Sequence, residues 1–147
     1  MAFNALAAGI ILGLLFSGSS ARPEIVVRHW EPMDYPPMSR LARIQGTVSI
    51  TGYLKQKEHS SDYQIETGKA EGHPMLRDAA VVNLKKWLFT CEECKSLEDR
   101  TFHVTYEFRF DEGCMEPQCF KRSSTFRSGK VLVEASAPEV VTTDSTK

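Results

Sequence analysis

The chain has 147 residues, a formal net charge of −1, and 41% hydrophobic and 25% charged residues. This length fits one domain with tails, and the composition is ordinary for a soluble globular protein. The near-neutral charge lacks the basic excess with which nucleic-acid-binding proteins hold phosphates, so nucleic acid is excluded as a partner.

The first 21 residues predict an export signal. An unbroken apolar run covers residues 5–16, and small residues follow at Ser19 and Ala21, as is typical of a signal peptide cleaved after Ala21. The alternative is an uncleaved anchor in the inner membrane, although a span needs about 20 apolar residues. We therefore expect a periplasmic or secreted chain, with residues 22–34 forming an N-terminal arm.

A short helix is predicted after this arm. The prolines at 36 and 37 suit a first helical turn, where a missing N–H group costs nothing. Leu41 and Ile44 are three residues apart, so we expect them to face one side and dock the helix. Gly46 is expected to end the helix.

Two strands are predicted next, joined by a polar turn. Residues 47–54 alternate between apolar and polar side chains, which indicates a half-buried strand. Gly52 interrupts the alternation and predicts a β-bulge. Residues 63–67 form a shorter alternating segment, which predicts the second strand.

The clearest helix is predicted over residues 72–89. Pro74 lies at its start, and apolar residues recur three and four positions apart along it. A polar loop over residues 91–100 should follow. The residues expected to face the core, and to be core rather than a ligand site, are Leu76, Ala80, Leu84, Trp87 and Leu88.

Residues 101–110 predict a long strand with one buried and one wet face, because apolar and polar residues alternate throughout. A loop bounded by cysteines follows. Residues 125–135 form a candidate for one more strand, and residues 136–147 read as a flexible tail. The side chains assigned to the buried face are Phe102, Val104, Tyr106, Phe108 and Phe110.

Four cysteines occur in this exported chain: Cys91, Cys94, Cys114 and Cys119. An even number in an oxidising compartment favours structural disulfides, and three pairings are open. A zinc site is an alternative, because two short cysteine spacings resemble a zinc ribbon. A redox pair is the third, although Glu92 and Glu93 would raise the thiol pKa values and disfavour the reactive thiolate.

No pattern of catalytic residues is present. The sequence contains no nucleophile elbow, no zinc-protease motif and no phosphate-binding loop, and its four histidines are dispersed. We therefore expect no enzymatic activity, no cofactor and no metal.

Several segments in this order resemble the C-terminal domain of the TonB family. The first runs from Tyr35 and Pro36 through Ile44 and Gly46 into the strand that holds Val48. The others are the helix that ends in Trp87 and Phe89 and the closing strand that ends at Phe110. The resemblance covers roughly residues 32–110.

This resemblance implies an α+β fold with a three-stranded antiparallel sheet, a candidate fourth C-terminal strand and two helices packed on one face, within a domain over residues 35–135. It also implies a periplasmic module that binds an outer-membrane transporter by adding a strand to an exposed sheet edge. The partner-binding residues implied are Pro32, Met33, Asp34, Tyr35 and Pro36 before the first helix, and Phe102, Val104, Tyr106 and Phe108 on the closing strand.

Two questions remain open on the sequence alone. Tyr35 and Pro36 are interpreted either as fixing the entrance to the first helix or as a partner contact, and the two roles are compatible. For the whole chain, the alternative to a transport role is an exported, disulfide-stabilised domain that reuses this fold structurally. A homodimer formed through an open strand edge is a further alternative.

Overall fold

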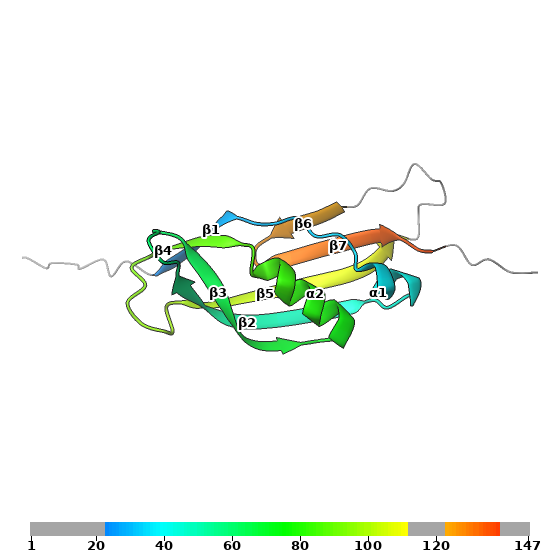
Figure 1. Ribbon diagram of the computed structural model, residues 1–147, viewed down its shortest axis with the longest axis horizontal. Helices are drawn as coiled ribbons and strands as arrows, with labels where there is room; N and C mark the ends of the chain where they lie inside the picture. The colour runs from blue at the N-terminus through cyan, green and yellow to red at the C-terminus, as the bar shows by residue number, and fades with distance from the viewer. Residues whose placement is uncertain (1–22, 112–122, 139–147) are drawn as a thin grey trace, which may run out of the picture.

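A computed structural model describes residues 23–111 and 123–138. Seven strands form one curled sheet, and two helices accompany it (Figure 1). In chain order the elements are β1 (Glu24–His29), α1 (Pro37–Leu41), β2 (Gly46–Gln56), β3 (Tyr63–Glu71), α2 (Pro74–Leu84), β4 (Leu88–Glu92), β5 (Thr101–Asp111), β6 (Ser123–Arg127) and β7 (Lys130–Ser136).

The sheet has the strand order β1-β4-β3-β2-β5-β7-β6. Every neighbouring pair is antiparallel except β5 and β7, which run parallel. The three predicted strands are the adjacent trio β3, β2 and β5. The expected three-stranded sheet is thus extended, by β4 and β1 on one side and by the β7–β6 hairpin on the other.

The C-terminal strand expected over residues 125–135 is two strands. A tight turn at Ser128 and Gly129 separates β6 from β7, and both turn residues have positive φ angles, 47° and 76°. Such a turn matches the twist of an antiparallel hairpin, and a Ser-Gly pair supplies it. This dipeptide was the sequence signal for the hairpin.

The second helix is shorter than predicted. It ends at Leu84 rather than at residue 89, and the chain enters β4 at Leu88. Phe89 pairs with both Val27 of β1 and Tyr63 of β3. The helical spacing of apolar residues continued past the real end because the first residues of a buried strand are also apolar.

Helix α2 lies against the concave face of the sheet, as Figure 1 shows. Its predicted core positions Leu76, Ala80 and Leu84 are fully buried, and so is Trp87 just beyond its end. For α1 the prediction is confirmed for Ile44, which packs against the core, and wrong for Leu41, which is 69% exposed. Ser39 is the fully buried residue of this helix. The helix is only five residues long, so one buried side chain and its flanks hold it in place.

Curling of the sheet brings its two outer strands towards each other (Figure 1). Trp30, directly after β1, contacts Phe126 of β6 with ring centroids 6.2 Å apart, and both rings also contact Trp87. The backbone N–H of Met33 donates to the Ser124 hydroxyl oxygen at 2.8 Å. The core is therefore enclosed on one side by the segment that links β1 to α1.

Gly52 marks a bulge between β2 and β3, as predicted. The register shifts there, so that Gly68 is the extra residue on β3. A side chain at position 52 would collide with the Glu66 carbonyl oxygen and with Ile65. Only glycine allows β2 and β3 to approach this closely.

Candidate functional site

The segment before α1 alternates between buried and exposed residues. Met33 and Tyr35 are 9% and 6% exposed, whereas Pro32 and Asp34 lie at the surface. The Tyr35 ring stacks on Phe110, with centroids 5.0 Å apart, and meets Phe108 edge-on. Pro32 and Asp34 are thus the members of this predicted site that present side chains outward.

Tyr35 fixes the chain at the entrance to α1. Its hydroxyl donates to the carbonyl oxygen of Ile44, which lies beyond the helix, so a single side chain ties both ends of α1 together. Burial raises the pKa of Tyr35 to about 12, because the charged phenolate is poorly solvated there. These contacts support the interpretation that Tyr35 holds the helix entrance.

The predicted partner-binding residues of β5 point into the core. Val104, Tyr106 and Phe108 are at most 2% exposed, and the half-buried Phe102 meets Phe89 with ring centroids 4.8 Å apart. Any partner that adds to this strand would therefore meet its main chain rather than these side chains.

The main-chain edge of β5 is occupied. β2 pairs with one side of β5, and β7 pairs in parallel with the other side over seven residues, from Thr105–Lys130 to Asp111–Ser136. The expectation that β5 presents an open edge is corrected by this pairing. Val131 and Val133 of β7 are fully buried, so apolar contact adds to the ladder.

Two arginines of the α1 region clasp the end of β7. Arg40 donates from Nε to the Ser136 carbonyl oxygen at 2.9 Å and from a terminal nitrogen to the Ser136 hydroxyl at 3.0 Å. Arg43 donates to the Pro138 carbonyl oxygen at 2.8 Å. We refer to Arg40 and Arg43 as the arginine clasp.

Charged pairs add further contacts between β5 and β7. Arg109 bonds to Glu134 at 2.7 Å, and Lys130 pairs with Glu107. The Lys130 ammonium lowers the pKa of Glu107 by hydrogen bonding and by its charge. These groups are exposed to solvent, so the pairs align the two strands more than they stabilise them.

A buried polar network lies between α2, β5 and the segment before α1. The Asn83 side-chain oxygen accepts from the Trp87 indole at 3.1 Å and from the Tyr106 hydroxyl at 2.9 Å, while its amide nitrogen donates to the Glu31 carbonyl oxygen at 2.9 Å. Burial raises the pKa of Tyr106 well above its usual value. Asn83 thus satisfies two buried donors and one partly buried carbonyl oxygen at once.

Sequence reasoning did not identify Asn83 or the arginine clasp. Asn83 lies on the buried face of α2, where a polar residue signals a hydrogen-bonded core position, but its partners are far away in sequence. Arg40 and Arg43 read as ordinary surface charges, and nothing local to them indicates the C-terminal end of β7.

The cysteines follow the expected structural role in part. Cys91 near the end of β4 and Cys94 in the following loop form a disulfide. Cys114 and Cys119 lie outside the described residues. Among residues 23–111 and 123–138, no group of three or more His, Cys, Asp or Glu side chains could hold a metal ion.

The predicted export signal also lies outside the described residues. Within the described ranges, no helix is long and apolar enough to cross a membrane.

Comparison with known families gives a match to one family model, described as Gram-negative bacterial TonB protein C-terminal, over residues 31–111. No curated protein and no solved structure matches the chain. The match covers the trio β3, β2 and β5, both helices and β4, whereas β1, β6 and β7 lie outside it. Because more than half of the chain is matched, this protein belongs to the TonB C-terminal family.

Proposed function

We propose that this chain is a periplasmic protein-binding module that engages an outer-membrane transporter by strand addition at β5. One observation carries the proposal: β5 accepts a parallel strand on its outer edge along residues 105–111, over seven residue pairs. The strand that fills this position, β7, comes from a segment outside the family match. An extended transporter segment would form the same ladder in its place.

Exchange of β7 for a partner strand preserves the main-chain hydrogen bonds, since each bond lost is replaced by an equivalent one. The side chains then decide the outcome. Val131 and Val133 fill core positions two residues apart, so a competing segment needs aliphatic side chains with the same spacing. This requirement would give selectivity even if no residue of this chain recognised the partner's polar side chains.

The arginine clasp sets how readily β7 leaves. Arg40 and Arg43 hold the carbonyl groups of Ser136 and Pro138 at the end of β7, where unpairing would begin. Binding to a state that is only fractionally populated weakens the apparent affinity by that fraction. Loosening the clasp should therefore raise the affinity for a partner strand.

The test is a binding titration with peptides from the periplasmic N-terminal segments of the source organism's outer-membrane transporters. We expect at least one peptide to bind, and Arg40→Ala combined with Arg43→Ala to bind it about tenfold tighter. The matched control is Arg28→Ala combined with Arg77→Ala, which removes two surface ion pairs remote from β7. If no peptide binds either the native chain or the clasp variant, the proposal is wrong.

The second candidate function is a structural envelope domain in which β7 closes the edge permanently. Full burial of Val131 and Val133 favours it, because release of β7 would expose both side chains. This candidate predicts that deletion of residues 123–147 makes the chain self-associate through the exposed β5 edge. A truncated chain that stays monomeric and equally stable would exclude it.

A further inference from the structure

A second strand edge, on the opposite side of the central trio, is open. β4 pairs with β3 only at Tyr63–Phe89 and then diverges, so within the described residues no strand covers β3 beyond Tyr63. On its inner side β3 is paired with β2 along its whole length. The outer side therefore presents main-chain groups to the surroundings.

The residues that present these groups can be assigned from the ladder. The N–H of Leu54 donates to the Arg100 carbonyl oxygen, so the main-chain N–H and C=O groups of Leu54 point towards β5 rather than towards β3. Its neighbour across the ladder, Ile65, then forms a non-hydrogen-bonded pair with β2 and directs its N–H and C=O outward. Thr67, two residues on, does the same.

The bulge limits how far a second strand could extend along this edge. Gly68 is the extra residue, and a bulge re-aims the following main-chain groups. Beyond the bulge, Lys69 and Glu71 form an ion pair at the exposed end of β3. Charged side chains at a strand edge discourage the addition of another strand. The usable strip therefore runs over Gln64, Ile65, Glu66 and Thr67.

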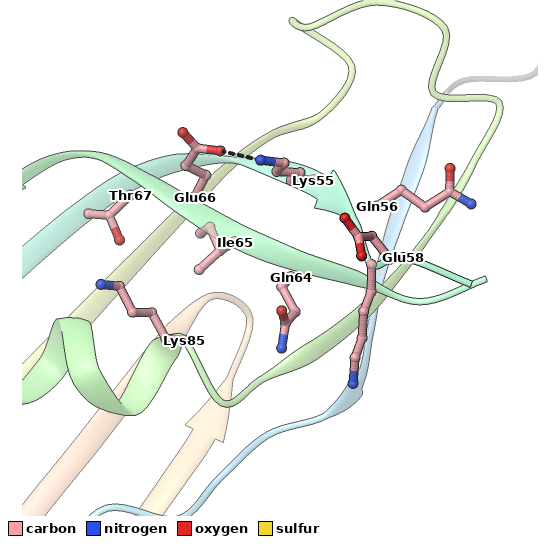
Figure 2. A pocket seen from close by; sticks show the side chains of 9 residues that line it. Lys55, Gln56, Glu58, Gln64, Ile65, Glu66, Thr67 and Lys85 are labelled. Carbon is pink, nitrogen blue, oxygen red and sulfur yellow. Dashed lines mark ion pairs between the residues drawn. The ribbon is translucent and has the colours of Figure 1, made fainter. Parts of the chain in front are cut away.

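A hollow of about 670 Å³ lies beside this strip. Figure 2 shows the side chains of Ile65 and Thr67 facing it from β3, and Lys85 reaching towards it from the end of α2. The buried Thr67 hydroxyl oxygen has no hydrogen-bond partner among the described residues. The hollow thus combines an apolar floor with polar groups that remain to be satisfied.

The charges around the hollow favour an acidic occupant. Lys55 already pairs with Glu66 (Figure 2). In the described part of the chain, neither Lys57 nor Lys85 has a carboxylate within ion-pair distance. Glu58 is the opposing charge on the rim, which leaves a net excess of one positive charge.

We propose that the β3 strip from Gln64 to Thr67, with Lys57 and Lys85 beside it, binds a short extended acidic segment of another protein. The segment pairs with the outward N–H and C=O groups of Ile65 and Thr67 and places carboxylates near the two lysines. This site is separate from the β5 edge, so it does not depend on exchange of β7.

The test uses three capped hexapeptides and amide chemical shifts of the full chain. The probe alternates valine with glutamate. One control replaces glutamate with lysine, and the other N-methylates alternate amides so that the peptide cannot pair as a strand. We expect the glutamate peptide alone to shift the Ile65 and Thr67 amides, while the Thr105 amide under β7 stays unchanged.

Variants then separate charge from fold. Lys57→Gln combined with Lys85→Gln should weaken binding of the glutamate peptide about threefold to tenfold. Lys86→Gln, one residue further along and away from this hollow, should leave it unchanged. Equal binding of the N-methylated or lysine peptide would overturn the proposal. So would shifts of Ile65 and Thr67 that follow protein concentration alone, because the occupant would then be a second copy of this chain.

Discussion

At the scale of single residues, Asn83 connects the segment before α1 to the core of the molecule. One side-chain oxygen accepts two buried donors, and the amide holds the backbone at Glu31. A hydrophobic residue of the same size would fill the space but leave those groups unpaired. The cost of such orphaned groups generally exceeds the gain from added apolar contact.

We predict that Asn83→Leu lowers the free energy of unfolding by about 2–5 kcal/mol, since two buried donors lose their acceptor. Urea denaturation measures this loss. Val82→Leu is the control, because Val82 is the neighbouring residue, is 60% exposed and should change stability by less than about 0.5 kcal/mol. Equal effects of the two substitutions would contradict the assigned network.

Tyr35 should make stability fall in alkaline solution. Its pKa rises from 10.0 in an exposed tyrosine to about 12 in the folded chain. Below pH 10 the residue is neutral in both states and its contribution is fully present. Between pH 10 and pH 12 the unfolded chain loses this proton while the folded chain keeps it, so stability falls as the pH rises.

We predict that Tyr35→Phe removes this part of the slope, up to about 1.4 kcal/mol per pH unit. At neutral pH it should cost about 1 kcal/mol, because the Ile44 carbonyl oxygen loses its donor. Urea unfolding at pH 8, 10 and 11.5 measures both effects. An unchanged slope above pH 10 would show that Tyr35 ionises freely in the folded chain.

At the scale of elements, β7 is part of the core rather than an appendage, although it lies outside the family match. We predict that Val133→Ala lowers the free energy of unfolding by about 2 kcal/mol, through lost burial and an incompletely filled cavity. Leu132→Ala, at the half-buried neighbouring position, should cost less than half as much. Two equal small effects would mean that β7 is only loosely attached in solution.

The Cys91–Cys94 disulfide closes a loop of four residues. In the chain-entropy model so short a loop stabilises by about 2 kcal/mol at most. We predict that replacing both cysteines with serine lowers the free energy of unfolding by no more than this amount. Intact mass after alkylation without reduction provides the direct check, because four free thiols in the protein isolated from its source would rule the disulfide out.

The sequence predicted elements well where one face of a periodic segment is buried and the other is wet. β5 is the clearest case, because its five inward aromatic and aliphatic residues lie as the alternation required. α2 was located correctly by the spacing of Leu76, Ala80 and Leu84, but its end was misplaced. There the apolar residues of the helix run directly into those of a buried strand.

The candidate site was harder to predict from the sequence than the fold. The family resemblance indicated β5 as the docking strand, yet whether its edge is free depends on β7, which begins 19 residues after β5 ends. A parallel pairing of this kind has no local signal, because no turn joins the two strands. The arginine clasp is hidden for the same reason, since Arg40 and Ser136 are 96 positions apart.

At the scale of the whole molecule, the sheet extends beyond the central trio β3, β2 and β5 on both sides. β1 and β4 cover one part of the β3 side and leave the strip at Gln64–Thr67, while β7 covers the β5 edge along residues 105–111 and β6 pairs with the far side of β7. A partner strand along residues 105–111 of β5 must therefore exchange with β7, whereas one at β3 need displace nothing. The two edges should differ in rate of binding as well as in selectivity.

Hydrogen exchange of the full chain, with and without a bound transporter peptide, tests the exchange of β7 most directly. The Thr105 N–H donates to the Gly129 carbonyl oxygen, so Val131 and Val133 direct their N–H groups at β5. Strand exchange predicts that the amides of Val131 and Val133 lose protection on binding, while the amides of Thr105 and Glu107 stay protected by the incoming strand. If Val131 and Val133 remain fully protected at saturating peptide, β7 does not leave, and β5 is not the docking strand.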